Sequence, residues 1–285
     1  SFQRNPSMPL PAPVPVDFER VLRLWCLTPE GEPIITPSSH LLPVRWMGRA
    51  AMLKRALDVE EQGGARVMSW WCGEGAALVY AYDGDTILME RAEGTRSLMH
   101  MALNGEDDQA SRIICDVARK LHQPREQPLP ELIGLREWFR DLAPAARRYG
   151  GLFPRCLDTA EALLASEQDR RVLHGDVHHD NVLDFAARGW LAIDPKRLYG
   201  ERLFDYANLL CNPDLPTSRE RTRFLRQLDV IVEHARVDRR RLLEWVLAFA
   251  GLSAAWFLDD GMAADSDLAV AHLAAAELDR MACCA

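Results

Sequence analysis

Residues 172–195 read Val-Leu-His-Gly-Asp-Val-His-His-Asp-Asn-Val-Leu-Asp-Phe-Ala-Ala-Arg-Gly-Trp-Leu-Ala-Ile-Asp-Pro. Three short apolar runs in this stretch are rich in β-prone residues: one leads into His174, one covers 182–183 and one covers 190–193. The segment 186–189 between the last two ends in glycine and has the composition of a turn. The pattern predicts strand, loop, strand, tight turn and strand.

Side chains that carry oxygen stand at the ends of these runs. They are Asp176, Asn181 and Asp194. Asp176 lies in a glycine-containing loop, where a carboxylate can reach the hydroxyl of a substrate and accept its proton. Carboxylate and amide oxygens also suit Mg²⁺, which keeps few protein ligands. A single aspartate at a turn is more simply read as a turn cap, so the expectation of a site depends on the joint pattern.

The charge balance argues against nucleic acids and membranes as partners. The 285 residues include 34 Lys and Arg against 42 Asp and Glu, which gives a net charge of −8 and a pI of about 5.5. An acidic protein repels nucleic acid and anionic lipid, whereas it is compatible with a cationic small molecule. A hydrophobic content of 48% is ordinary for a globular chain of two lobes.

The sequence predicts a cytoplasmic protein. No apolar run stands out at the ~20 residues needed to cross a bilayer. The first residues are polar and proline-rich, without the apolar segment of a signal peptide. The seven cysteines are scattered, and their spacing fits neither a disulfide framework nor a zinc site. The oligomeric state is unknown from the sequence.

The region 16–92 has the pattern of a small antiparallel sheet with one helix. Alternation over 18–25 favours a strand over a short helix. A helix fits 60–71, although a glycine pair inside it weakens it. Two hairpins are expected, over 44–54 and, across an Asp-Gly-Asp turn, over 76–90.

The chain changes character near residues 91–95. Residues 1–15 form a proline-rich, extended lead-in, whose first residues we attribute to cloning. From 93 to 285 the pattern is helical, which makes the fold class α+β with a ligand site expected between the two lobes. Helices are expected from Asp107 or Asp108 to before Pro124 and over 132–142, 156–164, 204–210, 219–234, 239–257 and 267–281.

The central stretch also resembles a known family. Its pattern His-Gly-Asp-x-His-x-x-Asn, followed thirteen residues later by the aspartate of Ile-Asp-Pro, resembles the catalytic core of aminoglycoside phosphotransferases and related antibiotic kinases. The resemblance is strongest to the streptomycin and hydroxyurea phosphotransferase branch and covers roughly residues 45–275. The segments that carry it are 173–181, 189–196, 200–208, 212–213 and 252–256.

The resemblance assigns roles to the residues of this stretch. It implies that Asp176 is the catalytic base and that Asn181 and Asp194 hold Mg²⁺, as their counterparts do in protein kinases. It also implies that His174 and Asp205 give structural support to the catalytic loop. A zinc site built on the three histidines of the loop is the weaker alternative, because their spacing fits tetrahedral zinc poorly.

The resemblance further implies a protein-kinase-like fold that binds ATP, with GTP not excluded. Residues 16–92 become the nucleotide-binding lobe, and 93–285 become the lobe with the catalytic loop and the acceptor site. Lys54 is expected to hold the phosphates, with Glu61, or alternatively Glu60, as its partner. Hydroxyl and amide donors of Ser38 and Ser39 are expected to cover the phosphates, since this turn contains no glycine.

Two further segments bear on the nucleotide and on the class of acceptor. Residues 89–92 resemble the hinge that meets the purine through its backbone, which makes Glu90 and Ala92 candidate contacts. The interval between Asp194 and the helix at Asp205 is too short for the activation segment of a protein kinase. We therefore expect a small-molecule acceptor.

Acidic residues of the C-terminal lobe are the candidates for binding a cationic acceptor. They are Glu201, Asp259 and Asp260. A carboxylate at the C-terminal end of a helix opposes the helix dipole, and a bound cation would offset that cost. The simpler interpretation, a solvated helix end, stays open for the last two.

The sequence thus predicts a kinase that transfers the γ-phosphoryl group of ATP to a hydroxyl of a streptomycin-type aminoglycoside. A metabolic kinase of the same fold, acting on choline, a sugar or an amino alcohol, is the first alternative. A nucleotide-binding module without catalysis and a metal-dependent hydrolase are the others.

Overall fold

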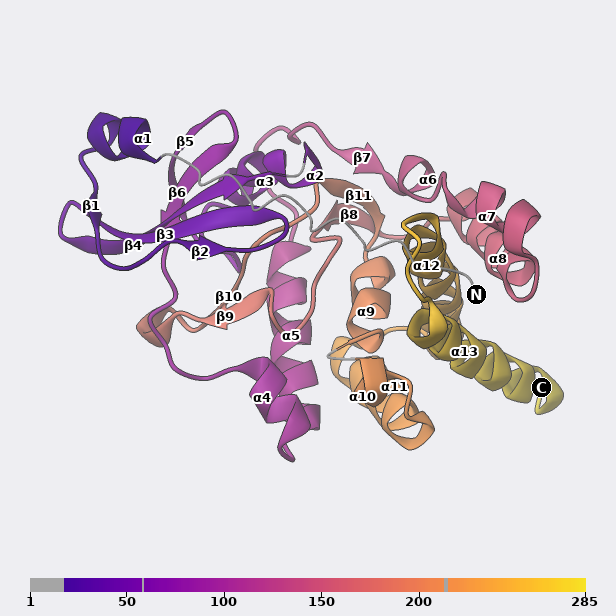
Figure 1. Cartoon of the computed structure of the whole chain (residues 1–285). Coiled ribbons are helices and arrows are strands. Elements are labelled where there is room, and N and C mark those ends of the chain that lie inside the picture. Colours follow the sequence, from indigo (N-terminus) through magenta and orange to yellow (C-terminus); the bar gives the residue numbers. More distant parts are fainter. Residues whose placement is uncertain (1–17, 58, 213–214) are drawn as a thin grey trace, which may run out of the picture.

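The computed structural model describes residues 18–57, 59–212 and 215–285. Its N-terminal lobe is a six-stranded antiparallel sheet in the order β1-β3-β4-β6-β5, with β2 paired to β3 (Figure 1). The strands are β1 Thr28–Pro29, β2 Ile34–Ile35, β3 Ser39–Trp46, β4 Arg49–Ala56, β5 Val79–Asp83 and β6 Thr86–Glu90. The lead-in 1–15 lies outside the described residues.

Both hairpins of this lobe are confirmed. β3 and β4 are joined by Met47 and Gly48, which have φ values of 48° and 75°. Positive φ at both central residues matches the right-handed twist of the flanking strands. β5 and β6 are joined at Gly84, with φ 61°. Glycine is suited to these positions because it has no Cβ to oppose positive φ.

The strand expected over 18–25 is wrong, since this segment is helix α1, Glu19–Leu24. Its buried side chains are Phe18 and Val21, three residues apart, which is a helical spacing. These two side chains pack against Val44 and Leu53 of the sheet. Burial against the sheet therefore outweighed the weak alternation in the sequence.

The expected helix 60–71 forms as two helices, α2 Val59–Gln62 and α3 Gly64–Trp71. They break at the glycine pair. A Cβ on Gly64 would lie 2.8 Å from the carbonyl oxygen of Pro195, so a side chain here would push α3 away from the segment after Asp194. The glycines that weaken the helix permit this close approach.

The C-terminal lobe is helical (Figure 1). Its helices are α4 Leu98–Leu103, α5 Asp107–Leu121, α6 Leu135–Trp138, α7 Leu142–Tyr149, α8 Phe153–Ala165, α9 Leu203–Leu210, α10 Leu215–Ser218, α11 Arg221–Ala235, α12 Arg239–Asp259 and α13 Asp265–Cys283. Together with the sheet-rich N-terminal lobe they confirm the predicted α+β fold class.

Helix α12 is the centre of this lobe. It packs against α8, α9 and α13, and most of its side chains from Leu242 to Ala255 are buried. It is long and apolar enough to cross a membrane by length and composition, contrary to the expectation from the sequence, but 67% of that window is buried inside the fold. Burial among helices explains its hydropathy.

The central stretch belongs to two small sheets. β9 Val182–Asp184 and β10 Trp190–Ala192 form the expected hairpin, with the 3-10 turn Ala186–Arg188 between them. β8 Arg170–Leu173 instead pairs with β11 Leu198–Glu201, beside β7 Ile133–Gly134. The first strand of the pattern is therefore not part of the hairpin.

The two lobes are joined through the β9–β10 hairpin. The amide of Gly94 donates to the carbonyl oxygen of Asp184 at 2.9 Å, and Arg96 donates to the Asp184 carboxylate at 3.0 Å. On the other strand, Ala192 exchanges backbone hydrogen bonds with the segment at Gly75 and Ala77. This hairpin therefore fixes both the linker after β6 and the segment after α3.

We expect Gly94→Ala to destabilise the fold. The new Cβ would lie 2.1 Å from the Asp184 side chain, which is buried and held by Arg96. Such overpacking costs about 1–3 kcal/mol. Chemical denaturation would measure the loss. Gly134→Ala is the matched control, because its Cβ would meet nothing within 4 Å; equal stability of the two variants would contradict a tight lobe junction.

Candidate active site

The loop between β8 and β9 is held by a buried carboxylate. Asp205, in the first turn of α9, is fully buried and accepts three hydrogen bonds. The amides of His174 and Gly175 donate at 3.0 and 2.8 Å, and Nε2 of His122 donates at 2.7 Å. Burial alone would raise the pKa of Asp205, but these donors outweigh it and lower the pKa. The carboxylate is therefore ionised.

Gly175 is required at its position in the loop. Its φ is 83°, and a Cβ would lie 2.8 Å from Leu198 and 2.9 Å from Lys196. Only glycine adopts this conformation without strain. The glycine lets the chain turn over the Asp205 carboxylate and places Asp176 beyond it.

His174 crosses from the loop to the segment before Asp194. Its Nε2 donates to the carbonyl oxygen of Ile193 at 2.7 Å, and its Nδ1 accepts from the amide of Asp176 at 3.2 Å. Complete burial lowers the pKa of His174, which agrees with a neutral ring used at both nitrogens. The ring also stacks on Trp71 of α3, with centroids 6.4 Å apart. His174 thus links the loop to both lobes.

Asp176, Asn181 and Asp194 come together as the sequence pattern predicts. The side-chain amide of Asn181 donates to the carbonyl oxygen of Asp176 at 2.9 Å, which closes the loop. The amide of Ile193 donates to the carbonyl oxygen of Asn181 at 2.9 Å, and this bond places Asp194 next to the loop. Asp194 has φ 55°, a left-handed conformation that aspartate tolerates better than most residues.

His178, which the sequence reasoning considered only for zinc, lies beside Asp176. Nε2 of His178 is 3.7 Å from Oδ2 of Asp176. Burial lowers the pKa of His178, but the Asp176 carboxylate outweighs this and raises it. In return, burial raises the pKa of Asp176, and His178 outweighs it, so that the pKa of Asp176 is lowered. Asp176 is therefore ionised, and the charge on His178 controls how strong a base it is.

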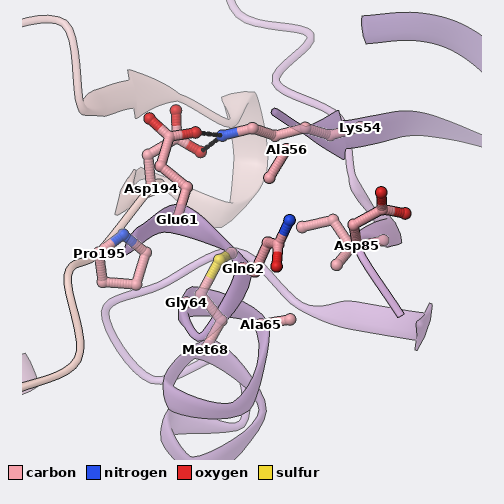
Figure 2. Close-up of a pocket in the computed structure, with 11 residues that line it drawn as sticks. Lys54, Ala56, Glu61, Gln62, Gly64, Ala65, Met68, Asp85, Asp194 and Pro195 are labelled. Carbon is pink, nitrogen blue, oxygen red and sulfur yellow. Dashed lines mark hydrogen bonds and ion pairs between the residues drawn. The ribbon is translucent and has the colours of Figure 1, made fainter. Parts of the chain in front are cut away.

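Lys54 lies between two carboxylates (Figure 2). Its Nζ is 2.5 Å from Oδ1 of Asp194 and 3.2 Å from Oε2 of Glu61. The lysine side chain is only 6% exposed, so the pair of acids compensates its buried charge. The alternative partner Glu60 lies among the side chains that the structure leaves undescribed. Lys54 on β4, Glu61 on α2 and Asp194 after β10 thus meet between the lobes.

The turn before β3 is used differently from the expectation. Oγ1 of Thr36 accepts from the amide of Ser39 at 3.0 Å and lies 3.0 Å from the Ser39 hydroxyl. Ser39 is buried, and its amide closes the turn. The expectation that Ser39 offers this amide to phosphate is wrong. Ser38 is half-buried and stays a candidate.

The hinge needs a similar correction. The amide of Glu90 donates to the carbonyl oxygen of Leu78 at 2.8 Å. The Glu90 carboxylate accepts from the amide of Leu78 and from Arg188. Sheet pairing therefore uses this amide and side chain, and the expected purine contact through the amide of Glu90 is wrong. Ala92 follows the strand and stays a candidate.

The donor set fits an oxygen-coordinated divalent ion. The Asn181 side-chain amide binds the loop through its nitrogen, which leaves its oxygen available as a metal ligand. The Asp194 carboxylate is 29% exposed. Two such oxygens suit Mg²⁺, which takes its other ligands from phosphates and water. Zinc does not fit, because both ring nitrogens of His174 are used and the described residues contain no cluster of three His, Cys, Asp or Glu side chains.

A cavity of about 290 Å³ opens beside Asp176. Its apolar wall consists of Met262 and four aromatic side chains from α6 and α12: Trp138, Phe249, Trp256 and Phe257. Trp138 and Trp256 meet edge to face at 5.3 Å. Its polar wall consists of Asp176, Lys196, Asn208, Ser253 and Asp260. Of the acids predicted to meet a cationic acceptor, Asp260 is the one in this wall.

The other two predicted acids lie elsewhere. Glu201 is 1% exposed, and its carboxylate accepts from Arg241 at 2.7 and 2.9 Å and from the amide of Gln168. The expectation that Glu201 binds the acceptor is therefore wrong, because it anchors β11 to α12. Asp259 accepts from the Tyr149 hydroxyl at 3.1 Å, outside the cavity wall.

The chain is similar to known proteins over most of its length. Residues 24–261 match the family described as aminoglycoside/hydroxyurea antibiotic resistance kinase. This chain belongs to that family.

The similar proteins include a streptomycin 3''-kinase of Klebsiella pneumoniae, 46% identical over 90% of this chain and 99% of its own length. A streptomycin 6-kinase of Streptomyces glaucescens is 31% identical over 91% and 88%. A thermostable mutant of aminoglycoside phosphotransferase APH(4)-Ia, in a ternary complex with ADP and hygromycin B, has a TM-score of 0.60 at 14% identity and covers 92% of this chain and 96% of its own.

Family membership settles the general activity. The chain is an antibiotic kinase that transfers a phosphoryl group to a hydroxyl of a small-molecule acceptor, with ATP and a divalent metal ion. The protein-kinase-like fold is confirmed by the solved structure. The sequence reasoning had missed His122, the aromatic wall and the pairing of His178 with Asp176, because these contacts form only when separate segments pack together.

We expect Asp205→Asn to lose about 3–5 kcal/mol of stability, because the new amide nitrogen would face donors and leave buried groups unpaired. The folded pKa of Asp205 is lowered below its ordinary value of 3.8. The difference from wild type should therefore be complete above that value and shrink as the pH falls through the folded pKa. Denaturant titrations at neutral and acidic pH would measure both. Asp158→Asn, at an exposed position of α8, is the control. An equal loss of stability in the two variants would contradict the anchoring role of Asp205.

The pairing of His178 with Asp176 should make the reaction rate depend on pH. Below its raised pKa, His178 is charged and weakens Asp176 as a base; above it the charge is lost. We expect kcat/KM to rise with pH through a value above the ordinary 6.5 of histidine. His178→Asn keeps an acceptor for the amide of Asp180 and should flatten this limb. A variant profile that superimposes on wild type would rule the coupling out.

Proposed function

We propose that this kinase phosphorylates a hydroxyl of a streptomycin-type aminoglycoside, with ATP and Mg²⁺ as cosubstrate and metal. The observation that carries the proposal is the position of Asp176, which lines a cavity with an aromatic side and a polar side that includes Asp260 and Lys196. A cationic aminocyclitol offers hydroxyls to the base and positive charge to Asp260. The similarity to two streptomycin kinases supports this choice of acceptor.

In this proposal Asp176 receives the proton of the acceptor hydroxyl. The hydroxyl oxygen forms a bond to the γ-phosphorus, the bond from that phosphorus to the bridging β–γ oxygen breaks, and ADP leaves. Asp176 is ionised, because the pKa of its carboxyl is lowered, so it is ready to accept. Most of the catalysis is positioning and neutralisation of charge.

Lys54 is proposed to hold the α- and β-phosphates, and Asn181 and Asp194 to hold Mg²⁺. The support is the location of Lys54, buried between Glu61 and Asp194. Glu61 would keep the lysine in place if Asp194 coordinated the metal ion. When bound, Mg²⁺ would neutralise charge that develops on the transferred phosphoryl group. Ser38 and Ala92 are proposed as phosphate and purine contacts.

We also propose that the protein acts in the cytoplasm, where ATP is available. All seven cysteines are free thiols, which is usual in a reducing compartment.

A metabolic kinase for choline or an amino alcohol is the second candidate. It is favoured by the four aromatic side chains of the cavity, since aromatic faces also bind quaternary ammonium groups. A panel of streptomycin, other aminoglycosides, hydroxyurea and choline, scored by ADP release, separates the candidates. Phosphorus NMR of the product would identify the modified hydroxyl, and turnover of choline alone would reject the proposal.

Asp176→Ala should lower turnover by roughly 10³-fold, because it removes the proposed general base. Nucleotide affinity should stay near wild type, since Lys54, Asn181 and Asp194 are intact. Steady-state kinetics and calorimetric titration with ATP would measure the two effects. Asp180→Ala removes an exposed carboxylate from the same loop and should leave turnover nearly unchanged. Undiminished phosphorylation by Asp176→Ala would reject the assigned role.

A further inference from the structure

A buried acid lies behind the wall of the cavity beside Asp176. Asp267, in the first turn of α13, is 6% exposed. Its Oδ2 accepts a hydrogen bond from Oγ of Ser253 on α12 at 2.9 Å. Ser253 belongs to the cavity wall, so the carboxylate is one hydroxyl away from the space that the acceptor would occupy.

The fold gives this carboxylate little compensation. Burial raises the pKa of Asp267, and only the Ser253 hydroxyl works in the opposite direction. No Lys, Arg or His among the described residues forms an ion pair with it. It does not cap α13, whose N-terminus has no side-chain cap. The N-terminal dipole of α13 favours a carboxylate in this turn, but a buried acid without a cation still costs stability, which suggests a role besides stabilising the fold.

The hydrogen bond to Asp267 leaves Ser253 as a hydrogen-bond acceptor toward the cavity. Its hydroxyl proton is donated to Asp267, so its oxygen can only accept a hydrogen bond from the cavity. The negative charge behind it strengthens it as an acceptor. A cationic group with N–H donors is the partner that such an oxygen favours.

A second unsatisfied group lines the same cavity. Asn208 of α9 is 2% exposed, and its side-chain oxygen has no hydrogen-bond partner among the described residues. Buried amides are normally satisfied. The side-chain oxygen of Asn208 therefore lacks a donor within the described part of the chain, and the oxygen of Ser253, whose proton is used by Asp267, can accept one as well.

We propose that Ser253 and Asp267 form a buried counter-charge that selects acceptors with a cationic N–H group in this cavity. Ser253 accepts the hydrogen bond and Asp267 supplies the charge, while Asp260 meets the acceptor at the rim. The inference rests on the proposed function, because it concerns the acceptor of that reaction. Ser253 is a substrate-binding residue and Asp267 a positioning residue behind it.

Asp267→Asn tests the charge at constant shape, since an amide oxygen can still accept from Ser253. The KM for a cationic aminoglycoside acceptor, streptomycin first, should rise about tenfold, while kcat and the KM for ATP stay near wild type. The melting temperature should stay the same or rise, because an unpaired buried charge is removed. Asp265→Asn removes an exposed carboxylate from the same helix turn and should change none of these values.

Ser253→Ala provides the second variant. It should raise the same KM, and the double variant should resemble the worse single variant, because the two side chains act as one unit. An unchanged acceptor KM in Asp267→Asn overturns the inference, and so does a lower melting temperature without a change in KM, which would make Asp267 structural. If wild-type enzyme phosphorylates no cationic acceptor, the proposed function fails first and the inference falls with it.

Discussion

The catalytic loop depends on one interaction, the acceptance of three hydrogen bonds by the buried carboxylate of Asp205. Two of the donors are consecutive backbone amides of the loop, and the third is the ring of His122 on α5. A buried charge is tolerated only when it is satisfied, so the carboxylate forces the loop, α5 and α9 into one arrangement. Asp176 gains its position as a consequence.

Buried polar contacts also connect the two lobes. Lys54 of the sheet is buried between acids from α2 and from the segment after β10, and the ring of His174 lies against Trp71 of α3. Gly64 and Gly94 allow backbone to approach other segments where any side chain would collide. The phosphate side and the acceptor side of the site therefore meet at the catalytic loop.

Much of this was accessible from the sequence. The hairpins, most helices and the group Asp176, Asn181 and Asp194 follow from local patterns of turns and apolar residues. The predictions that were wrong share a cause. Residues 18–25 became helical because two side chains pack on the sheet. Ser39 forms its hydrogen bonds within its own turn, and Glu201 pairs with Arg241, which is distant in the sequence. Exposure and pairing of a polar residue depend on neighbours that a linear pattern does not contain.

The sequence by itself determined the fold class, the family resemblance and the grouping of Asp176, Asn181 and Asp194, because these depend on fixed spacings within short segments. Only the tertiary structure decided which acids line the cavity beside Asp176. Asp260 lies in the cavity wall, Glu201 is neutralised by Arg241, and Asp267 lies buried behind Ser253. The cavity beside Asp176 is assembled from α6, α9, α12 and the turn before α13, and the packing of separate helices, unlike the spacing within a loop, leaves no signature in any one segment.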